Sequence, residues 1–172
     1  MQKNGWRTLN DMKLYHGSYL NIGKISLAKC KRYKDFGKAF YLSEDKSQAE
    51  EMANNVAAFI GGTPTLNVFE CDDNIFNDKE SNPLKIKIFE HYCLEWAEFV
   101  WNNRDDNQDF SHPYDIVYGP IANDNIGLQM RMYRMSGKTL EEFLKGLVYH
   151  KGETFQYAFC TERAIKLLKK LS

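Results

Sequence analysis

The chain has 172 residues, of which 43% are hydrophobic and 27% charged, a composition typical of one folded globular domain with its own core. Basic and acidic side chains balance at 23 each, so no overall field favours nucleic acid or an anionic membrane. No stretch approaches the roughly 18 apolar residues of a membrane span, and residues 1–12, a predicted lead-in, lack the apolar core of a signal peptide.

The four cysteines are widely scattered, at Cys30, Cys71, Cys93 and Cys160. No two have the close spacing of a zinc knuckle or a redox dithiol, and the histidines lie in separate segments, so we expect no metal site. Free, mostly buried thiols are typical of a reducing compartment, and we expect a cytoplasmic protein.

The first half of the chain predicts strands and one clear helix. We expect a strand over Met12–His16, an irregular stretch over Lys24–Tyr33, a short strand over Phe40–Leu42, a helix over Ser47–Ile60 and a strand over Thr65–Glu70. Ser47 followed by Glu50 is the pattern of a capping box, and Gly61-Gly62 ends the helix. An acidic turn is expected over Cys71–Asp78, followed by a loop around Pro83.

The second half mixes the same two kinds of element. We expect a helix over Cys93–Asn103, a strand over Tyr114–Tyr118 ended by Gly119-Pro120, helices from about Asn123 and Thr139, a strand over Phe155–Cys160 and a helix over Thr161–Leu171. The Thr-Leu-Glu-Glu opening at Thr139 is again a capping pattern. Strands and helices do not alternate as regular βαβ units. The order therefore predicts a mixed α+β domain and not a doubly wound parallel sheet.

Two short runs carry most of the functional signal: LYHGS at 14–18 and KDFGKAFYLS at 34–43. The first ends a predicted strand on His16, directly followed by Gly17, and the second places a turn glycine before the strand that carries Tyr41. Taken alone, His16 is explained by a bond to a backbone carbonyl, and Tyr41 by a core position with a solvated hydroxyl. Together, an imidazole and a phenol from two strand ends indicate a pocket for a flat, hydroxyl-rich ligand such as a nucleotide cofactor.

These runs resemble the first two signature motifs of ADP-ribosyltransferases of the His-Tyr-Glu type, the diphtheria-toxin and poly-ADP-ribose-polymerase branch. His16-Gly17-Ser18 matches the first motif. The segment 36–41 matches the second except at Ala39, where the family has glycine.

The chain is similar, more closely, to a family of bacterial ADP-ribosyltransferase-like proteins. The shared features are a strand over Tyr114–Pro120 ending in Gly-Pro, then Asn123-Asp124, and a late strand that starts at Gln156. This similarity runs from about Leu14 to Lys170.

The resemblance implies one domain over 1–172 with an ADP-ribosyltransferase-like α+β fold: two small packed antiparallel or mixed sheets around an NAD cleft, with flanking helices. It implies that His16 binds a ribose hydroxyl of NAD, that Gly17 presents backbone groups to the nicotinamide amide, and that Tyr41 stacks on nicotinamide from the opposite wall. A glycine suits that place because a missing Cβ lets a ligand approach the main chain.

The third motif departs from the pattern. Cleavage of the ribose–nicotinamide bond has an oxocarbenium-like transition state, and the superfamily places a glutamate at the start of a late strand to meet it. This chain has Gln156 there, on the semi-polar face of the strand with Ala158 and Cys160. A glutamine orients ribose hydroxyls but carries no charge, and a glutamine on a solvated sheet surface explains the strand equally well.

The candidate catalytic residues are His16, Tyr41 and Gln156, and the candidate cofactor-binding residues are His16, Gly17, Ser18, Arg32, Phe36, Gly37, Tyr41, Asn123 and Asp124. Arg32 is included because, like Lys34 and Lys38, it flanks the second motif and can reach a pyrophosphate. Helix capping is the favoured explanation of Asn123, and Asp35 is assigned to a turn.

The functional prediction is transfer of ADP-ribose from NAD to a macromolecule, or NAD hydrolysis, without a metal. A protein is the expected acceptor in preference to a nucleic acid, because the chain has no net charge. The resemblance further implies a bacterial toxin or effector with a small antitoxin-like protein partner and no membrane contact. The alternative is a weak or inactive module of the same fold that binds NAD, ADP-ribose or another protein, and a plain interaction domain stands third.

Overall fold

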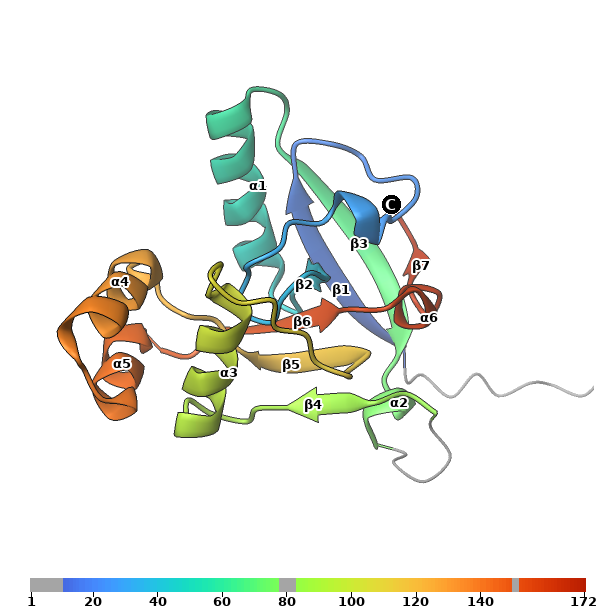
Figure 1. The fold of residues 1–172 in the computed structure, drawn as a ribbon. Coiled ribbons are helices and arrows are strands. Elements are labelled where there is room, and N and C mark those ends of the chain that lie inside the picture. Colours follow the sequence, from blue (N-terminus) through green and yellow to red (C-terminus); the bar gives the residue numbers. More distant parts are fainter. Residues whose placement is uncertain (1–10, 78–82, 150–151) are drawn as a thin grey trace, which may run out of the picture.

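The computed structural model describes residues 11–77, 83–149 and 152–172 (Figure 1). Its elements are β1 (Asp11–Ser18), the 3-10 helix η1 (Leu27–Lys29), β2 (Phe40–Leu42), α1 (Lys46–Ile60), β3 (Thr65–Asp72), α2 (Asn74–Asn77), β4 (Ile86–Ile88), α3 (Leu94–Arg104), β5 (Ile116–Pro120), α4 (Ile126–Ser136), α5 (Leu140–Leu147), β6 (Phe155–Phe159), α6 (Glu162–Ile165) and β7 (Lys169–Lys170). The predicted α+β class is confirmed. Most of the expected lead-in lies outside the described residues, as does Asp78 at the end of the expected acidic turn.

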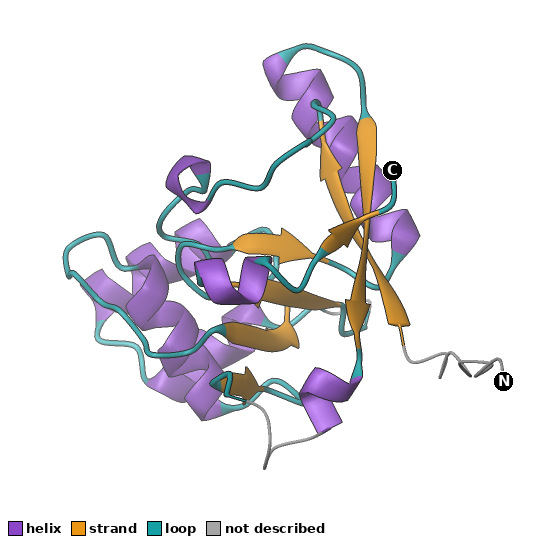
Figure 2. Cartoon of the chain, turned by 90° about the vertical axis from the view of Figure 1, so that its right-hand side faces the viewer, coloured by secondary structure: helices purple, strands orange, loops and turns teal. Residues whose placement is uncertain are grey.

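Two small open sheets form the framework. Three antiparallel strands, in the order β1-β3-β7, make one sheet, and β2-β6-β5-β4 make the other, in which only β4 and β5 run parallel. The strands of the two sheets run at a steep angle to one another in both views (Figures 1 and 2). A single antiparallel bridge between Tyr15 of β1 and Ser43, just after β2, joins the sheets.

One apolar core lies between the two sheets. Leu14 and Phe69 from the first sheet meet Phe40, Ile116 and Phe159 from the second, and all five are almost fully buried. Each such side chain stabilises the fold by about 1.5–3 kcal/mol through the apolar area that it removes from water. This core holds β1 against β2 and so brings the two predicted motifs together.

The other face of the second sheet carries a second core beneath helices. Val117 and Ala158 of the sheet pack against α3, α4 and α5, whose buried side chains include Trp96, Met130 and Phe143. Helix α1 instead covers the first sheet, so α1 and the group α3–α5 lie on different parts of the molecule (Figure 1). No helix within the described ranges is both long and apolar enough to cross a bilayer.

Strand β5 does not stop where the sequence predicted. Gly119 and Pro120 stay in the strand and pair with Gln156 and Phe155 of β6. A Cβ at Gly119 would lie 3.0 Å from the ring of Phe36, so close packing explains this glycine and a turn does not. The expectation that Gly-Pro ends the strand is wrong because the neighbouring β6 continues to pair.

Helix α1 is capped two residues before the predicted cap. Asp45 is the N-cap, and its side chain accepts hydrogen bonds from the backbone N–H groups of Ser47 (2.9 Å) and Gln48 (3.4 Å). The predicted capping box of Ser47 with Glu50 is therefore wrong. The same pattern at Thr139 with Glu142 is confirmed, with both bonds of the box present.

The predicted last helix over Thr161–Leu171 is also wrong beyond its first turn. Helix α6 ends at Ile165, and Lys169–Lys170 pair with β3 as β7. The Nζ atom of Lys170 donates a hydrogen bond to the carbonyl of Ile22 (2.8 Å), which fixes the chain at the sheet edge. Strand pairing outweighs helical propensity here because β3 offers an open edge.

Candidate functional site

The two sheets diverge just after the bridge that joins them. Tyr15 and Ser43 exchange two backbone hydrogen bonds, of 2.8 and 2.9 Å. The register of that bridge puts Gly17 opposite Tyr41, yet no backbone hydrogen bond joins these two residues. The strands therefore separate between the first and second predicted motifs.

The imidazole of His16 lies at the point of separation. Its Nδ1 donates a hydrogen bond to the carbonyl of Tyr41 (2.7 Å), and its ring stacks on Phe40 at 4.4 Å between centroids. Burial lowers the pKa of His16, and the Tyr41 carbonyl only partly opposes this shift. At neutral pH the imidazole is uncharged, with Nε2 as an acceptor to which no described residue donates.

Main-chain groups also face this separation. In an antiparallel pair, alternate residues direct their N–H and C=O groups to the same edge, so those of Gly17 point the same way as those of Tyr15. The N–H of Tyr41 points back toward β1 for the same reason. Within the described residues, Gly17 forms no hydrogen bond on this edge, which leaves one donor and one acceptor for a ligand.

The side of Gly17 that a Cβ would occupy is filled by helix α1. A Cβ there would lie 2.0 Å from the carbonyl oxygen of Ala49 and 2.6 Å from the nitrogen of Ala53. The glycine is therefore required for close packing of the helix on β1. The predicted reason for this glycine, space for a ligand beside Cα, is therefore wrong. The N–H and C=O groups of Gly17 on the edge of β1 are still without a hydrogen-bond partner among the described residues.

The phenol of Tyr41 lies on the opposite face of β2 from His16. Its hydroxyl donates to the carbonyl of Gly37 (2.8 Å) and accepts from the N–H of Phe36 (3.0 Å). Burial, followed by the negative charge of Asp35, raises the pKa of Tyr41 well above its usual value, so the hydroxyl stays protonated. The expectation that the two rings face each other across a groove is wrong: His16 contacts the Tyr41 main chain.

Gln156 shares the face of Tyr41 and is bound to an acid that the sequence assigned to a turn. Its Nε2 donates to Oδ2 of Asp35 (3.0 Å). Asp35 is only 4% exposed, and it also accepts hydrogen bonds from Nε of Arg104 (2.6 Å) and the N–H of Ala122 (3.2 Å). Asp35 lies in a turn, as predicted, but it is also a buried structural acid, which the sequence did not indicate. Sequence reasoning missed it because Asp before Phe-Gly is an ordinary turn pattern.

The neighbours of these motifs serve the fold. Ser18 is buried, and its hydroxyl accepts from the N–H of Leu20 (3.2 Å). Phe36 is fully buried in the core beneath the helices, so its ring does not reach a ligand. Gly37 has φ of +82°, where glycine is favoured, and a Cβ would lie 2.7 Å from the side chain of Asn103.

Asn123 and Asp124 form no hydrogen bond with the described residues of the first two motifs. The side chain of Asn123 donates to the carbonyls of Gly146 (2.7 Å) and Val148 (3.2 Å) and so ties the β5–α4 loop to α5. Asn125, not Asn123, is the N-cap of α4, so the helix-cap explanation is wrong. Asp124 is exposed and hydrogen-bonds to Tyr149, which contributes to raising the pKa of that tyrosine to about 12 after the larger effect of burial.

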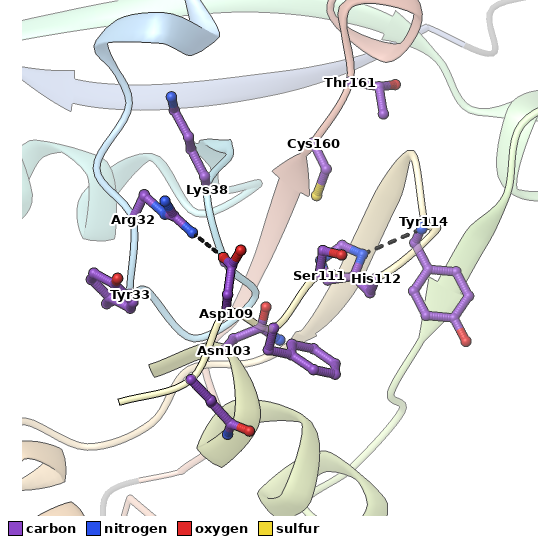
Figure 3. Close-up of a pocket in the computed structure, with 13 residues that line it drawn as sticks. Arg32, Tyr33, Lys38, Asn103, Asp109, Ser111, His112, Tyr114, Cys160 and Thr161 are labelled. Carbon is purple, nitrogen blue, oxygen red and sulfur yellow. Dashed lines mark hydrogen bonds and ion pairs between the residues drawn. The ribbon is translucent and has the colours of Figure 1, made fainter. Parts of the chain in front are cut away.

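A cavity of about 300 Å³ opens beside the second motif (Figure 3). It is lined by Arg32, Tyr33, Gly37, Lys38, Asn103, Gln108, Asp109, Phe110, Ser111, His112, Tyr114, Cys160 and Thr161. Of the predicted cofactor-binding residues, it contains Arg32, which is ion-paired to Asp109 (2.7 Å), and Gly37. Lys38 forms no hydrogen bond or ion pair with the described residues, so its charge is available to an anion.

His112 and Cys160 line this cavity but do not form a nucleophilic pair. Nε2 of His112 donates to the carbonyl of Phe36 (3.0 Å) and Nδ1 accepts from the N–H of Tyr114 (3.3 Å), so both nitrogens are engaged. Burial, then the charge of Asp115, raises the pKa of the Cys160 thiol to about 12, the reverse of an activated cysteine. Among the described residues, no three side chains of the usual metal-ligating types come together.

Comparison with known proteins gives one result. A family model described as a protein of unknown function (DUF3990) matches residues 12–170. No curated protein and no solved structure matches the chain. The match covers nearly the whole sequence and includes both predicted motifs and the Gln156 strand, so the chain belongs to the DUF3990 family.

Proposed function

We propose that the protein binds NAD where β1 and β2 diverge and cleaves its ribose–nicotinamide bond, either transferring ADP-ribose to a protein acceptor or hydrolysing NAD. The resemblance to His-Tyr-Glu ADP-ribosyltransferases motivates this reaction, and the fold would then be the one that those motifs imply. The observation that carries the proposal is the meeting of the first two motifs at the diverging strands, 25 residues apart in sequence.

The chemistry available there suits a nicotinamide riboside. A carboxamide needs one acceptor and one donor, and the main chain of Gly17 offers both on an unpaired edge. A ribose hydroxyl needs an acceptor, and Nε2 of the uncharged His16 is one. Each such bond contributes about 0.5–1.5 kcal/mol net, so the three bonds together reach at most about 4.5 kcal/mol, which corresponds to binding in the millimolar range.

The pyrophosphate of the ligand needs positive charge, which the cavity beside the second motif offers. Lys38 and Arg32 lie at the cavity beside the second motif and supply positive charge for a pyrophosphate (Figure 3). Arg32 is shared with Asp109, so Lys38 is the stronger candidate. A toxin or effector role with a small protein partner that holds it in check remains part of the proposal, through the resemblance alone.

Incubation of the purified chain with NAD labelled in nicotinamide tests the reaction. We expect saturable binding by calorimetry and nicotinamide release above the rate in buffer. The variant His16→Ala should weaken binding by about tenfold, because it removes a hydrogen-bond acceptor and a ring contact. His91→Ala is the matched control, since His91 is exposed and contacts Glu153 and not the first two motifs.

Two results would count against the proposal. Absence of NAD binding up to about 1 mM, the upper end of ordinary substrate affinities, would remove it. Equal losses in the His16 and His91 variants would show that the imidazole at the diverging strands has no part in binding.

A second candidate function, NAD or ADP-ribose binding without turnover, is favoured by one observation. Gln156 carries no charge, and its amide group is already engaged by Asp35. Losing one well-placed electrostatic contact typically lowers a rate by about 10²–10³. Saturable binding with no nicotinamide release would support this second function in place of the first.

A further inference from the structure

A second cavity lies between the end of α3 and one face of α4. It measures about 290 Å³ and is lined by Arg104, Asp106, Gly127, Met130, Arg131 and Arg134. Three of these residues are arginines and one is acidic. The cavity shares no lining residue with the one beside the second motif. Its size, at the lower end of ligand sites, admits a small ion or metabolite.

Helical spacing puts the α4 residues of the lining on one face. Gly127, Arg131 and Arg134 follow the spacing i, i+4, i+7, which is that of neighbours along one side of a helix. The ring of Tyr133 packs edge-on against Trp101 of α3 at 4.7 Å between centroids, and this contact holds the two helices together. Glycine at position 127 leaves the cavity open, because a Cβ there would have no other atom within 4 Å.

Arg104 is held in place while part of its guanidinium stays unused. Its Nε donates to Oδ1 of Asp35 at 2.6 Å, and no described residue accepts from its two Nη groups. Asp35 is buried and in turn accepts from the side chain of Gln156 (3.0 Å) and from the N–H of Ala122 (3.2 Å). The side chain of Arg104 is 25% exposed, so burial and this network both restrict it. A guanidinium that is fixed in advance loses little conformational entropy when it binds an anion.

The charge of Arg134 is neutralised by neighbouring acids, and that of Arg131 is not. Asp105 and Asp106 pair with Arg134 at 2.6 and 3.5 Å. Arg131 is exposed and forms no ion pair or hydrogen bond with the described residues. Helix α4 also has no side-chain cap at Asn125, so the N–H groups of its first turn add partial positive charge at that end.

The surroundings of Arg104 are positively charged as well. Lys34 forms no ion pair within the described part of the chain. Burial, and then the positive charges of Arg104 and Lys31, lower the pKa of Lys34, and Asp35 opposes this shift only partly. An anion bound at Arg104 would therefore reduce the repulsion among these groups.

We propose that this cavity binds a phosphate dianion, either free inorganic phosphate or the phosphate group of a small phosphorylated metabolite, between the Nη groups of Arg104 and the guanidinium of Arg131. Guanidinium groups present paired donors that match the oxygens of a phosphate. A phosphate monoester carries about −1.5 to −2 charges at pH 7, close to the sum of two arginines, whereas a carboxylate carries a single charge. The inference goes beyond NAD binding at the diverging strands and does not depend on it.

Two-dimensional NMR of the isotope-labelled chain at constant ionic strength tests the site. Titration with inorganic phosphate or glycerol phosphate should shift the amide signal of Gly127 and the Nε–H signals of Arg104 and Arg131. Acetate, with less charge, should bind at least about tenfold more weakly. Tighter binding of glycerol phosphate than of inorganic phosphate assigns the site to a phosphorylated metabolite, and equal or weaker binding assigns it to free phosphate.

Variants on the face of α4 locate the bound anion. Arg131→Gln should weaken phosphate binding by at least about tenfold, because it removes one of two charged groups, and it should fold because Arg131 has no partner to lose. Gly127→Glu should abolish binding, since the space beside Gly127 accepts a side chain that brings a negative charge. Lys145→Gln, at an exposed position on α5, removes the same charge elsewhere and should leave the affinity unchanged.

Four results would overturn the site. They are an absence of phosphate-dependent shifts up to about 10 mM, beyond the ordinary range of ligand affinities; acetate binding as tight as phosphate binding; equal losses in Arg131→Gln and Lys145→Gln; and a loss in Arg32→Gln with none in Arg131→Gln. The last of these would move the phosphate to the cavity beside the second motif. The His16 variant measures NAD binding separately, so failure of either proposal leaves the other standing.

Discussion

The Nδ1 atom of His16 lies 2.7 Å from the carbonyl oxygen of Tyr41. This bond spans the place where β1 and β2 stop pairing through their backbones, and it substitutes a side chain for the missing main-chain contact. The same bond fixes which nitrogen of the ring carries the proton. It is thus both a structural link between the two sheets and the reason that Nε2 is an acceptor.

Replacement of His16 by alanine should destabilise the fold as well as weaken NAD binding. The substitution removes the bond to Tyr41 and the ring contact with Phe40, and we expect a loss of about 1–3 kcal/mol in the free energy of unfolding. Urea denaturation measures this loss. His91→Ala, at an exposed site, should change stability by less than about 0.5 kcal/mol. Equal losses for the two variants would contradict the structural role.

The stability of the protein should fall on mild acidification. Burial lowers the pKa of His16 in the folded state below its ordinary value of 6.5, and burial acts in the same direction on His112. On acidification the unfolded chain therefore binds protons more readily than the folded chain does. The contribution of the two uncharged histidines to the free energy of unfolding is full above pH 6.5 and declines below it. Unfolding free energies measured from pH 7.5 to pH 5 should show this slope.

Variants of the two histidines show which of them causes the slope of unfolding free energy against pH. His16→Gln removes one titrating group and keeps a donor for the Tyr41 carbonyl, so it should reduce the slope. A slope unchanged in both His16→Gln and His112→Gln would contradict the assignment. Imidazole proton shifts in NMR titrations report each pKa directly.

Glycine at position 17 should be among the least replaceable residues of the chain. In Gly17→Ala the new Cβ would lie 2.0 Å from the backbone carbonyl of Ala49, so helix α1 must move as a unit. We expect a loss of at least about 3 kcal/mol, at the upper end of the usual cost of overpacking. Thermal unfolding and helix content by circular dichroism measure the effect.

Gly127→Ala on α4 provides the control, because a Cβ at that position would have no other atom within 4 Å and the φ of Gly127 is not positive. Alanine there should stabilise the protein by about 0.4–1 kcal/mol through the unfolded state. If Gly17→Ala is tolerated as well as Gly127→Ala, the close packing of α1 on β1 is refuted.

Asp115 should dominate stability below pH 4. Burial alone would raise the pKa of this carboxyl, but Arg163, Thr161 and the N–H of Lys85 donate to it and lower the pKa to about 2. Because the pKa of Asp115 is lower in the folded state than in the unfolded chain, this carboxylate stabilises the folded state fully above the unfolded value of 3.8. That stabilisation is lost as the pH falls toward 2. The contribution is on the order of 2 kcal/mol.

Asp115→Asn should remove this acid-dependent step, and acid titration of the unfolding free energy detects it. Asp109→Asn, at a side chain that is 91% exposed, should leave the step in place. A step of the same size in Asp115→Asn would assign the acid sensitivity to another group.

The N-cap of α1 makes a further prediction. Asp45→Ala should cost about 1 kcal/mol, because two backbone donors lose their acceptor. Ser47→Ala should cost less than half of that, since Ser47 lies inside the first turn and its hydroxyl donates to Asp45. Thermal melts of the two variants compare them, and the reverse order would restore Ser47 as the cap.

Local patterns in the sequence were enough for much of this protein. A turn glycine before an aromatic-rich run located the strand at Phe40–Leu42, and alternation of bulky with small or semi-polar residues located the strand predicted over Phe155–Cys160. The Thr139 capping pattern located the start of α5. These predictions succeed because each depends on neighbours within a few positions along the chain. The contact between His16 and Tyr41, 25 residues apart, was suggested only by the pairing of the two motifs, and it is made to the Tyr41 main chain and not to its ring.

Tertiary contacts decided the rest. The continuation of β5 through Gly119-Pro120 and the end strand β7 depend on partners on β6 and β3, which no local pattern reveals. Asp35 reads as a turn residue in sequence, yet its partners Arg104 and Gln156 lie 69 and 121 residues away and make it a buried ion-pair acid. A charge is placed by the donors that compensate its burial, and those donors come together only when the chain has folded.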